Sequence, residues 1–212
     1  QIELNQSPKR IISLVPSQTE LLFDLGLEEE VVGITKFCIH PKKWFDTKPR
    51  VGGTKTLNFD KIDSLQPDLI IANKEENTQA EIEFLQDKNP VYTSDISNLE
   101  ESIEMITTLG EITNTPQKAG RIINSIVTEF DKLKQVKKLN KSVLYFIWQK
   151  PYMSISQETF INDMLSKCGF ENSINKKDRY PELNELEIRS INPDCMFLSS
   201  EPFPFKEKHK KC

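Results

Sequence analysis

The chain has 212 residues, a formal net charge of -4 and 37% hydrophobic residues. Such a length allows one or two domains with a sizeable buried core. The acidic balance argues against a nucleic-acid-binding surface, which normally carries a basic excess. No apolar run approaches the roughly 18–20 residues of a membrane span, and the opening QIELNQSPKR contains no apolar stretch of a secretory leader.

The cysteines and histidines limit the chemistry that the chain can carry. No two of the four cysteines form a C-x-x-C pair, so neither a zinc ribbon nor a thioredoxin-type site is expected. We expect Cys195, in an apolar strand, and Cys168, at the end of an amphipathic helix, to pack as small hydrophobic residues. His40 and His209 are the only two histidines, which excludes a metal site with several histidine ligands.

Strands and helices alternate along the first half of the chain. Short apolar runs rich in β-branched residues predict buried strands over residues 10–15, 31–35, 69–72 and 90–94. Helical spacing and stop signals predict helices over residues 16–26, 58–68, 77–87 and 98–113. Ser17, with Glu20 three residues later, is typical of a capping box. Repeated β–α units favour a mostly parallel sheet covered by helices on both faces.

A long helix separates this half from the rest. Residues 115–139 contain no turn signal, begin with a capping Thr115 and Pro116, and carry apolar residues at helical spacing. At about 1.5 Å per residue, such a helix is roughly 35 Å long. The β–α pattern then restarts, with strands expected over residues 142–148, 152–156 and 195–200 and helices over residues 159–169 and 183–193.

The sequence therefore predicts an α/β protein with two Rossmann-like lobes. We expect an N-terminal lobe over residues 1–114, a bridging helix over 115–139 and a C-terminal lobe over 140–212. One phrase occurs in both lobes, as SLQPDLIIANKEE (64–76) and as SINPDCMFLSSEP (190–202). We interpret each copy as a proline stop followed by a buried parallel strand, which makes the repeat architectural. The loops that follow these strands are where a ligand is expected.

No cofactor or catalytic motif is present. The sequence lacks G-x-x-x-x-G-K-[ST], G-x-G-x-x-G, H-E-x-x-H and G-x-S-x-G. What remains is a set of aromatic and polar residues just after predicted strands, where parallel α/β sheets bind ligands. The candidates are Ser17, Gln18, Lys36, Phe37, His40, Trp44, Lys74 and Glu76 in the first lobe, and Trp148, Tyr152, Tyr180, Glu201 and Phe203 in the second. Two facing sets would line an aromatic small-molecule cleft, although each residue has an ordinary structural alternative in the core, a turn or the solvated surface.

Several stretches together resemble one protein family. They are KRIISLVPSQTELLFDLGL, VVGITKFCIHP, RVGGTKTLNFDKIDSLQPDLIIANKEEN, WQKPYMSISQETFINDMLSKCGFEN and INPDCMFLSSEPFPFKEKH. The family is the bacterial periplasmic substrate-binding proteins with a helical backbone, which serve ABC importers of cobalamin and ferric siderophores. The cobalamin-binding branch is the most similar, and RIISLVPSQTEL is the most specific stretch.

The resemblance implies two α/β lobes of the class III type joined by one rigid helix, with the ligand held between them by aromatic side chains. The aromatic positions of the family fall on Trp148, Tyr152 and Tyr180, whereas His40 has no counterpart in the pattern. The family continues beyond EKH through a further strand and a closing helix, so the resemblance implies that the second lobe lacks part of its sheet edge.

The resemblance also implies an acidic side chain on each lobe that docks on the transporter. The first-lobe position falls on Asp60. The second falls on Leu186, which departs from the pattern. Glu185 and Glu187 lie on either side of it, and we assign the contact to Glu187, with Glu185 as the alternative.

We therefore predict a non-enzymatic, exported receptor that acts in the periplasm or at the cell envelope, with its leader absent from this chain. It would bind a metal chelate, either a corrinoid such as cobalamin or a ferric siderophore, and deliver it to ABC transporter permease subunits. We expect a monomer with no resident cofactor, no bound metal ion of its own and no nucleic-acid partner. Two alternatives stay open, a small α/β enzyme using the cleft and a receptor for a metal ion itself.

Overall fold

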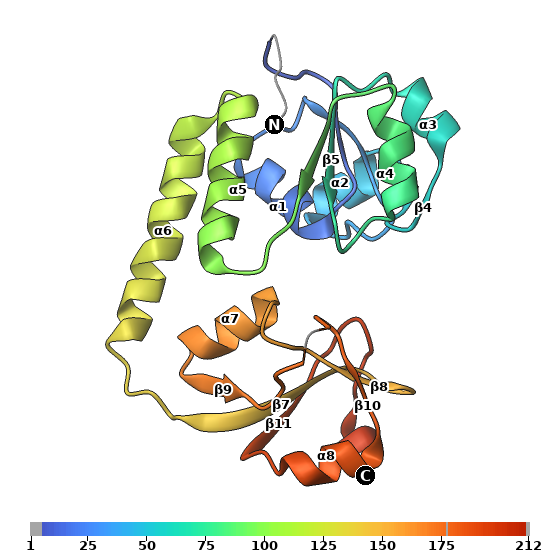
Figure 1. Ribbon diagram of the computed structural model, residues 1–212. Helices are drawn as coiled ribbons and strands as arrows, with labels where there is room; N and C mark the ends of the chain where they lie inside the picture. Colours follow the sequence, from blue (N-terminus) through green and yellow to red (C-terminus); the bar gives the residue numbers. More distant parts are fainter. Residues whose placement is uncertain (1–5, 177, 211–212) are drawn as a thin grey trace. The chain divides into compact units, whose positions relative to one another are not determined.

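The computed structural model describes residues 6–176 and 178–210, and its elements form an α/β fold, as predicted (Figure 1). The chain divides into two compact units. The first unit consists of the chain up to Asp95 together with Ile103–Asn124, and the second consists of Ile96–Ser102 together with the chain from Ser125 onward. The units are thus interleaved in sequence, whereas the predicted lobes are contiguous segments.

The first unit is built on a four-stranded parallel sheet with the order β2-β1-β5-β6. Its strands are β1 (Ile11–Ser13), β2 (Val31–Ile34), β5 (Leu69–Asn73) and β6 (Val91–Ser94). Its helices include α1 (Pro16–Asp24), α3 (Phe59–Ser64), α4 (Gln79–Gln86) and most of α5 (Leu99–Ile112). Figure 1 shows α3 and α4 on one side of the sheet and α1 and α5 on the other. Since all four strands are parallel, their carboxyl ends meet at one edge.

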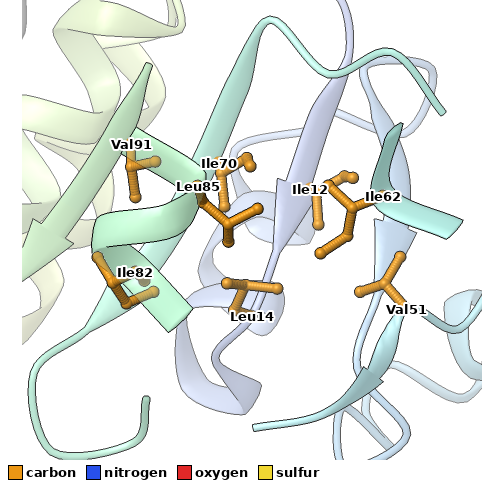
Figure 2. Packing of buried hydrophobic residues seen from close by; sticks show 9 residues of the cluster. Ile12, Leu14, Val51, Ile62, Ile70, Ile82, Leu85 and Val91 are labelled. Atoms are coloured by element: carbon orange, nitrogen blue, oxygen red, sulfur yellow. The ribbon is translucent and has the colours of Figure 1, made fainter. Parts of the chain in front are cut away.

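Apolar side chains from strands and helices form the core on the α3 and α4 face (Figure 2). The strands contribute Ile12, Leu14, Ile70, Ala72 and Val91, and the rest of the cluster is Val51, Ile62, Ile82 and Leu85. Every member is buried. Fully burying one such side chain stabilises a fold by about 1.5–3 kcal/mol, so this face fixes the register of the strands.

Three features of the first unit differ from prediction. Helix α1 has Val15 as its N-cap residue without a side-chain hydrogen bond, so the predicted capping box is wrong. Pro16 begins the helix and places Ser17 inside its first turn. The sequence also gave no signal for the short helix α2 (Lys42–Thr47) or for the hairpin of β3 (Gly52–Gly53) and β4 (Thr56–Leu57).

The long helix α6 (Pro116–Lys134) begins at the predicted proline but ends five residues before the predicted end at 139. Its last turn tightens, because the N–H groups of Gln135 and Val136 each bond the carbonyl three residues earlier. Val136 and Leu139 are each 62% exposed, so little burial supports further helix here.

The second unit contains a mixed sheet with the order β10-β8-β7-β11, to which β9 adds alongside β7. Its strands are β7 (Lys141–Trp148), β8 (Tyr152–Ser154), β9 (Phe170–Asn172), β10 (Glu182–Leu183) and β11 (Cys195–Leu198). Strands β9 and β11 are parallel to β7, whereas β8 is antiparallel to both β7 and β10. The remaining elements are α7 (Phe160–Lys167), α8 (Glu185–Ile191) and a 3₁₀ helix, η1 (Glu207–Lys210).

The repeated Pro-Asp phrase has the same role in both units. The carboxylate of Asp68 accepts hydrogen bonds from the backbone N–H groups of Lys9 (2.7 Å) and Arg10 (2.8 Å), just before β1. The carboxylate of Asp194 accepts one from the N–H of Ser142 (2.9 Å), near the start of β7. Each aspartate therefore hydrogen-bonds to the backbone at the beginning of a strand of its sheet, β1 or β7. This shared role supports the architectural interpretation of the repeat.

The cysteine expectations have different outcomes. Cys195 is partly buried in β11 and packs against an apolar cluster. Cys168 is exposed, because it is the C-cap residue of α7 and lies beyond the buried face of that helix. Among the described residues, no helix combines the length and the apolar character needed to cross a membrane.

Candidate functional site

A buried hydrogen-bond network lies at the carboxyl edge of the first sheet, centred on Ser94 at the end of β6. The hydroxyl of Ser94 donates to the carbonyl of Ala72 (3.3 Å) and accepts from Gln18 Nε2 (2.5 Å) and Asn73 Nδ2 (3.1 Å). Gln18 is only 2% exposed. Its side chain therefore braces α1 against β6, which corrects the expectation that it lies on the ligand surface.

The side chains of Asn73 and Asn77 hold the loop after β5 in place. Asn77 Oδ1 accepts from the N–H of Asn73 (2.9 Å), and Asn77 Nδ2 donates to the carbonyl of Thr54 (2.9 Å). Asn73 Oδ1 accepts from the N–H groups of Glu75 (2.9 Å) and Glu76 (3.2 Å). These bonds are local Asx-type contacts, so an asparagine on each side of a short polar loop was the signal available in the sequence.

The charged side chains of this loop remain at the surface. Lys74 and Glu76 are both exposed. The ammonium group of Lys74 lies 2.6 Å from a carboxylate oxygen of Asp95, which follows β6. Because both partners are largely solvated, this ion pair orients Lys74 more than it stabilises the fold.

The loop after β2 exposes apolar side chains, and a buried cysteine within it anchors its backbone. Phe37 and Ile39 are each 51% exposed, whereas Cys38 between them is fully buried. The Cys38 sulfur lies 3.1 Å from Thr19 Oγ1 and 3.2 Å from Thr35 Oγ1. The alternation of exposed and buried side chains gives this loop an apolar outer surface on a fixed base.

Lys36 and Trp44, which flank this loop, differ in exposure. The Lys36 ammonium lies 5.1 Å from the centre of the Phe37 ring, at the distance of a cation–π contact. Trp44, expected as a ligand wall, is fully buried and packs edge-on against Phe23, with ring centres 5.4 Å apart. It belongs to the core, because α2 turns its indole inward, and we remove it from the candidate site.

Aromatic side chains gather at the carboxyl end of β7 in the second unit. Trp148 ends the strand, is 38% exposed, and has its ring centre 5.6 Å from that of Phe203 in an edge-on arrangement. Phe203 in turn contacts Phe205, at 4.7 Å, and His209, at 5.3 Å. Phe205 and His209, which follow in a segment with no strand or helix pattern, thus join the predicted Trp148 and Phe203.

The two predicted tyrosines lie on opposite faces of the second sheet. Tyr152 packs with the cluster that contains Leu144, and Tyr180 packs with the cluster that contains Val143. Neighbouring residues of β7 point to opposite faces, so these two rings are separated by the sheet. Both are partly buried, and Trp148 is therefore the most exposed of the three predicted aromatic positions.

Ser17, His40 and Glu201 complete the predicted set. Ser17 is exposed in the first turn of α1, His40 is exposed in the loop after β2, and Glu201 is exposed in the loop after β11. A groove of about 930 Å³, which the sequence did not predict, also lies in the second unit beside α8, β11 and η1. Tyr152 is the one predicted site residue in its lining. Its walls are otherwise mainly apolar, and they include Met196, which is 55% exposed.

The two predicted docking positions lie in the first turns of α3 and α8. Each of these helices precedes a parallel strand, β5 or β11. A helix that connects parallel strands runs antiparallel to them, so its first turn lies near the carboxyl ends of the strands. Asp60 is exposed there. Glu187 is committed to its own helix, because it forms a capping box with Asn184 and an ion pair with Lys176, at 2.8 Å.

These contacts of Glu187 have an electrostatic consequence. The hydrogen bond from Lys176 and the backbone bond from Asn184 lower the pKa of the Glu187 carboxyl group. Glu185 is exposed in the same turn. In the described part of the chain, no group of three or more His, Cys, Asp and Glu side chains is arranged to hold a metal ion.

A model of the family described as periplasmic binding protein matches residues 11–211. The chain belongs to the periplasmic binding protein family. This match spans both units, so the predicted resemblance is confirmed at the level of the family.

Three relatives indicate which members of the family this periplasmic binding protein resembles. A vitamin B12-binding protein of Vibrio parahaemolyticus serotype O3:K6 is 26% identical over 199 residues, covering 92% of this chain and 72% of that protein. YvrC of Bacillus subtilis (strain 168), an uncharacterised ABC transporter substrate-binding lipoprotein, is 26% identical over 92% of this chain and 65% of its own length. The crystal structure of the periplasmic vitamin B12 binding protein BtuF of Vibrio cholerae matches with a TM-score of 0.80 at 26% identity, covering 91% of this chain and 76% of that one.

Proposed function

We propose that this periplasmic binding protein is the exported solute receptor of an ABC import system, with a metal chelate as its solute. The observation that carries the proposal is the aromatic pair of exposed Trp148 and half-buried Phe203 at the carboxyl end of β7, in a chain of this family. The relatives named as vitamin B12-binding proteins favour a corrinoid as the solute, and a ferric siderophore is the second candidate. We assign no catalytic step to the chain.

In the proposed complex, each unit offers side chains from the carboxyl edge of its own sheet. Trp148 and Phe203 supply flat apolar contacts from the second unit, and Phe37 supplies one from the first. Stacking and shape dominate such binding, while a few polar groups fix orientation. Lys36, Glu76 and Ser17 are the exposed polar groups of the first unit suited to that task, and Glu201 is the corresponding group of the second. Tyr152 and Tyr180 would support the aromatic ends from within the sheet.

Delivery to the permease would use the acidic first turns of α3 and α8. We keep Asp60 as the first contact. For the second we move the contact from Glu187 to Glu185, because the Glu187 carboxylate is occupied by Asn184 and Lys176, whereas Glu185 is exposed.

The solute can be tested through the tryptophan fluorescence of the chain. Trp44 is buried and Trp148 is exposed, so a Trp44→Phe variant leaves Trp148 as the single reporter. We would titrate it with cyanocobalamin, cobinamide, hemin and a ferric hydroxamate siderophore. A saturable quench with at least one of them is expected, and it should disappear in the Trp44→Phe, Trp148→Phe double variant.

Calorimetry on the unmodified chain provides the independent measurement. If no chelate produces a saturable quench or a heat of binding, the proposed function is wrong. A turnover product formed from any of these chelates would instead support the enzyme alternative.

A further inference from the structure

The segment that leads from the last turn of α6 to the first residue of β7 is strongly basic (Figure 1). Over residues 131–141 it carries one acidic side chain, that of Asp131, and five lysines, in a chain whose formal net charge is -4. Every residue of the segment is exposed. The lysines are Lys132, Lys134, Lys137, Lys138 and Lys141.

Apolar side chains are exposed among these lysines. Val136 and Leu139 are each 62% exposed, and Leu133 is 38% exposed. A single exposed apolar side chain is ordinary on a protein surface. Three of them at intervals of three residues, within a run of lysines, make this segment both basic and apolar.

The segment is anchored to the second unit through its backbone. The N–H of Asn140 donates a hydrogen bond to the carbonyl of Gly169 (3.0 Å), in the turn after α7. A Cβ atom placed on Gly169 would lie 3.1 Å from the Cα of Lys138, so the two backbones are in close contact. The exposed side chains therefore extend from a fixed backbone, which lowers the entropy cost of binding a partner.

Two of the lysines have no anionic partner within the chain. The other three each form an ion pair with an acidic side chain, at N–O distances of 2.6, 2.7 and 3.0 Å. Lys137 and Lys138 form no ion pair or side-chain hydrogen bond with any residue that the structure describes. Their ammonium groups are available to an anionic partner outside the chain.

The combination of charge and apolar surface fits the interface of an anionic lipid bilayer. Lysine ammonium groups are attracted to the headgroups, while apolar side chains beside them enter the boundary between headgroups and acyl chains. A nucleic acid would satisfy the charges, but the segment has no aromatic side chain on which bases could stack. The exposed valine and leucines would then remain in water.

We propose that residues 131–141 are a contact surface for an anionic lipid bilayer. Lys137 and Lys138 lie at the headgroup phosphates, and Val136 and Leu139 insert among the headgroups. The contact does not depend on which solute the protein binds. A reversible contact of this kind would keep a receptor close to the membrane that holds its permease.

Vesicle binding by the whole chain tests the proposal. Co-sedimentation would be measured with vesicles of phosphatidylglycerol and phosphatidylcholine and with vesicles of phosphatidylcholine alone. Binding is expected only to the anionic vesicles, and high salt should weaken it. Because a lysine near such a surface strengthens binding roughly fivefold, the Lys137→Gln, Lys138→Gln double variant should bind about 25-fold more weakly. The Lys9→Gln, Lys55→Gln double variant is the matched control, since it removes the same charge from exposed lysines of the first unit and should change little.

The apolar part of the contact has a test of its own. The Val136→Ser, Leu139→Ser double variant keeps every charge and should bind anionic vesicles about tenfold more weakly. Leu139→Trp, made together with Trp44→Phe and Trp148→Phe, places a single tryptophan in the segment. Its emission should shift to shorter wavelength on anionic vesicles, because its ring leaves water. Circular dichroism checks the folding of each variant.

The proposal is overturned if the unmodified protein does not bind anionic vesicles, or if the control variant loses as much binding as the Lys137→Gln, Lys138→Gln variant. It is also overturned if double-stranded DNA binds as tightly as the vesicles and the serine variant binds both without loss, because the segment would then recognise polyanions in general. Quenching of Trp148 by chelates should be unchanged in the lysine variants, so failure of this proposal leaves the receptor function standing.

Discussion

Asp194 shows how one exposed carboxylate organises the start of a strand. The N–H of Ser142 is the largest cause of its lowered pKa, followed by the hydrogen bonds of Lys141 and the Ser142 hydroxyl. Together they lower the pKa of Asp194 from 3.8 to about 2. All three donors belong to the first residues of β7, so the ionised carboxylate ties the loop before β11 to the central strand of the second sheet.

Replacing this carboxylate should make stability depend less on acid pH. A group with a lowered folded pKa contributes stability above its unfolded pKa and loses it as pH falls through the folded value. Asp194→Asn should therefore lower the free energy of unfolding at neutral pH, and its difference from the unmodified protein should shrink between about pH 4 and 2. Urea unfolding across this range is the measurement. Glu171→Gln, at an exposed position in β9, is the control and should change little.

Substitutions of the two tryptophans should affect different properties, stability for Trp44 and chelate binding for Trp148. Trp44→Ala should cost about 3–5 kcal/mol of stability, because it empties a fully buried site. Trp148→Ala should leave stability nearly unchanged but weaken chelate binding by about 1 kcal/mol or more, because its ring is partly exposed. Thermal unfolding and ligand titration of both variants separate these effects. Equal chelate affinity in folded Trp148→Ala would show that this ring does not contact the solute.

At the scale of elements, α8 depends on its cap. This helix has seven residues and no fully buried side chain, so packing contributes little to it. Asn184 and Glu187 bond each other's backbone N–H groups, at 3.0 and 2.8 Å. Such reciprocal capping compensates the unpaired donors of the first turn.

Removing the cap should open α8 locally. Asn184→Ala should cost about 1 kcal/mol, and hydrogen exchange of the α8 amides should quicken while that of β7 stays slow. Glu185→Gln is the matched control in the same turn, since its side chain takes no part in the capping box. Uniformly faster exchange throughout the second unit would mean that the cap supports more than this one helix.

Two glycines test how closely α5 and α6 pack. A Cβ atom placed on Gly110 of α5 would lie 2.4 Å from the Cβ of Ala119, whereas one placed on Gly120 of α6 would meet nothing within 4 Å. Gly110→Ala should destabilise the protein by about 1–3 kcal/mol through overpacking. Gly120→Ala should stabilise it by about 0.5–1 kcal/mol, because alanine restricts the unfolded chain. Denaturant unfolding of the two variants should show these opposite signs.

At the scale of the molecule, the alternation of strands and helices could be predicted from the sequence. Buried parallel strands stand out as short apolar runs between segments whose apolar residues recur at helical spacing. Local sequence could not place Trp44, whose burial depends on Phe23 in another helix. It also could not assign Tyr152 and Tyr180 to opposite faces, since the register of β7 and β8 shifts between Phe146 and Trp148. Lys36, Phe37, Lys74 and Glu76 are exposed in the loops after β2 and β5, whereas buried braces such as Gln18 and Asn77 depend on partners that only the fold supplies.

The interleaving of the two units affects how the protein can assemble. The chain passes from one unit to the other after residues 95, 102 and 124, so α5 and α6 each belong to both. The first N–H of α5, on Leu99, bonds Asp163 Oδ2 at 2.8 Å, and Glu100 pairs with Lys167. The beginning of α5 therefore cannot complete its contacts until α7 is present, and neither unit can be obtained by cutting the chain at a single point.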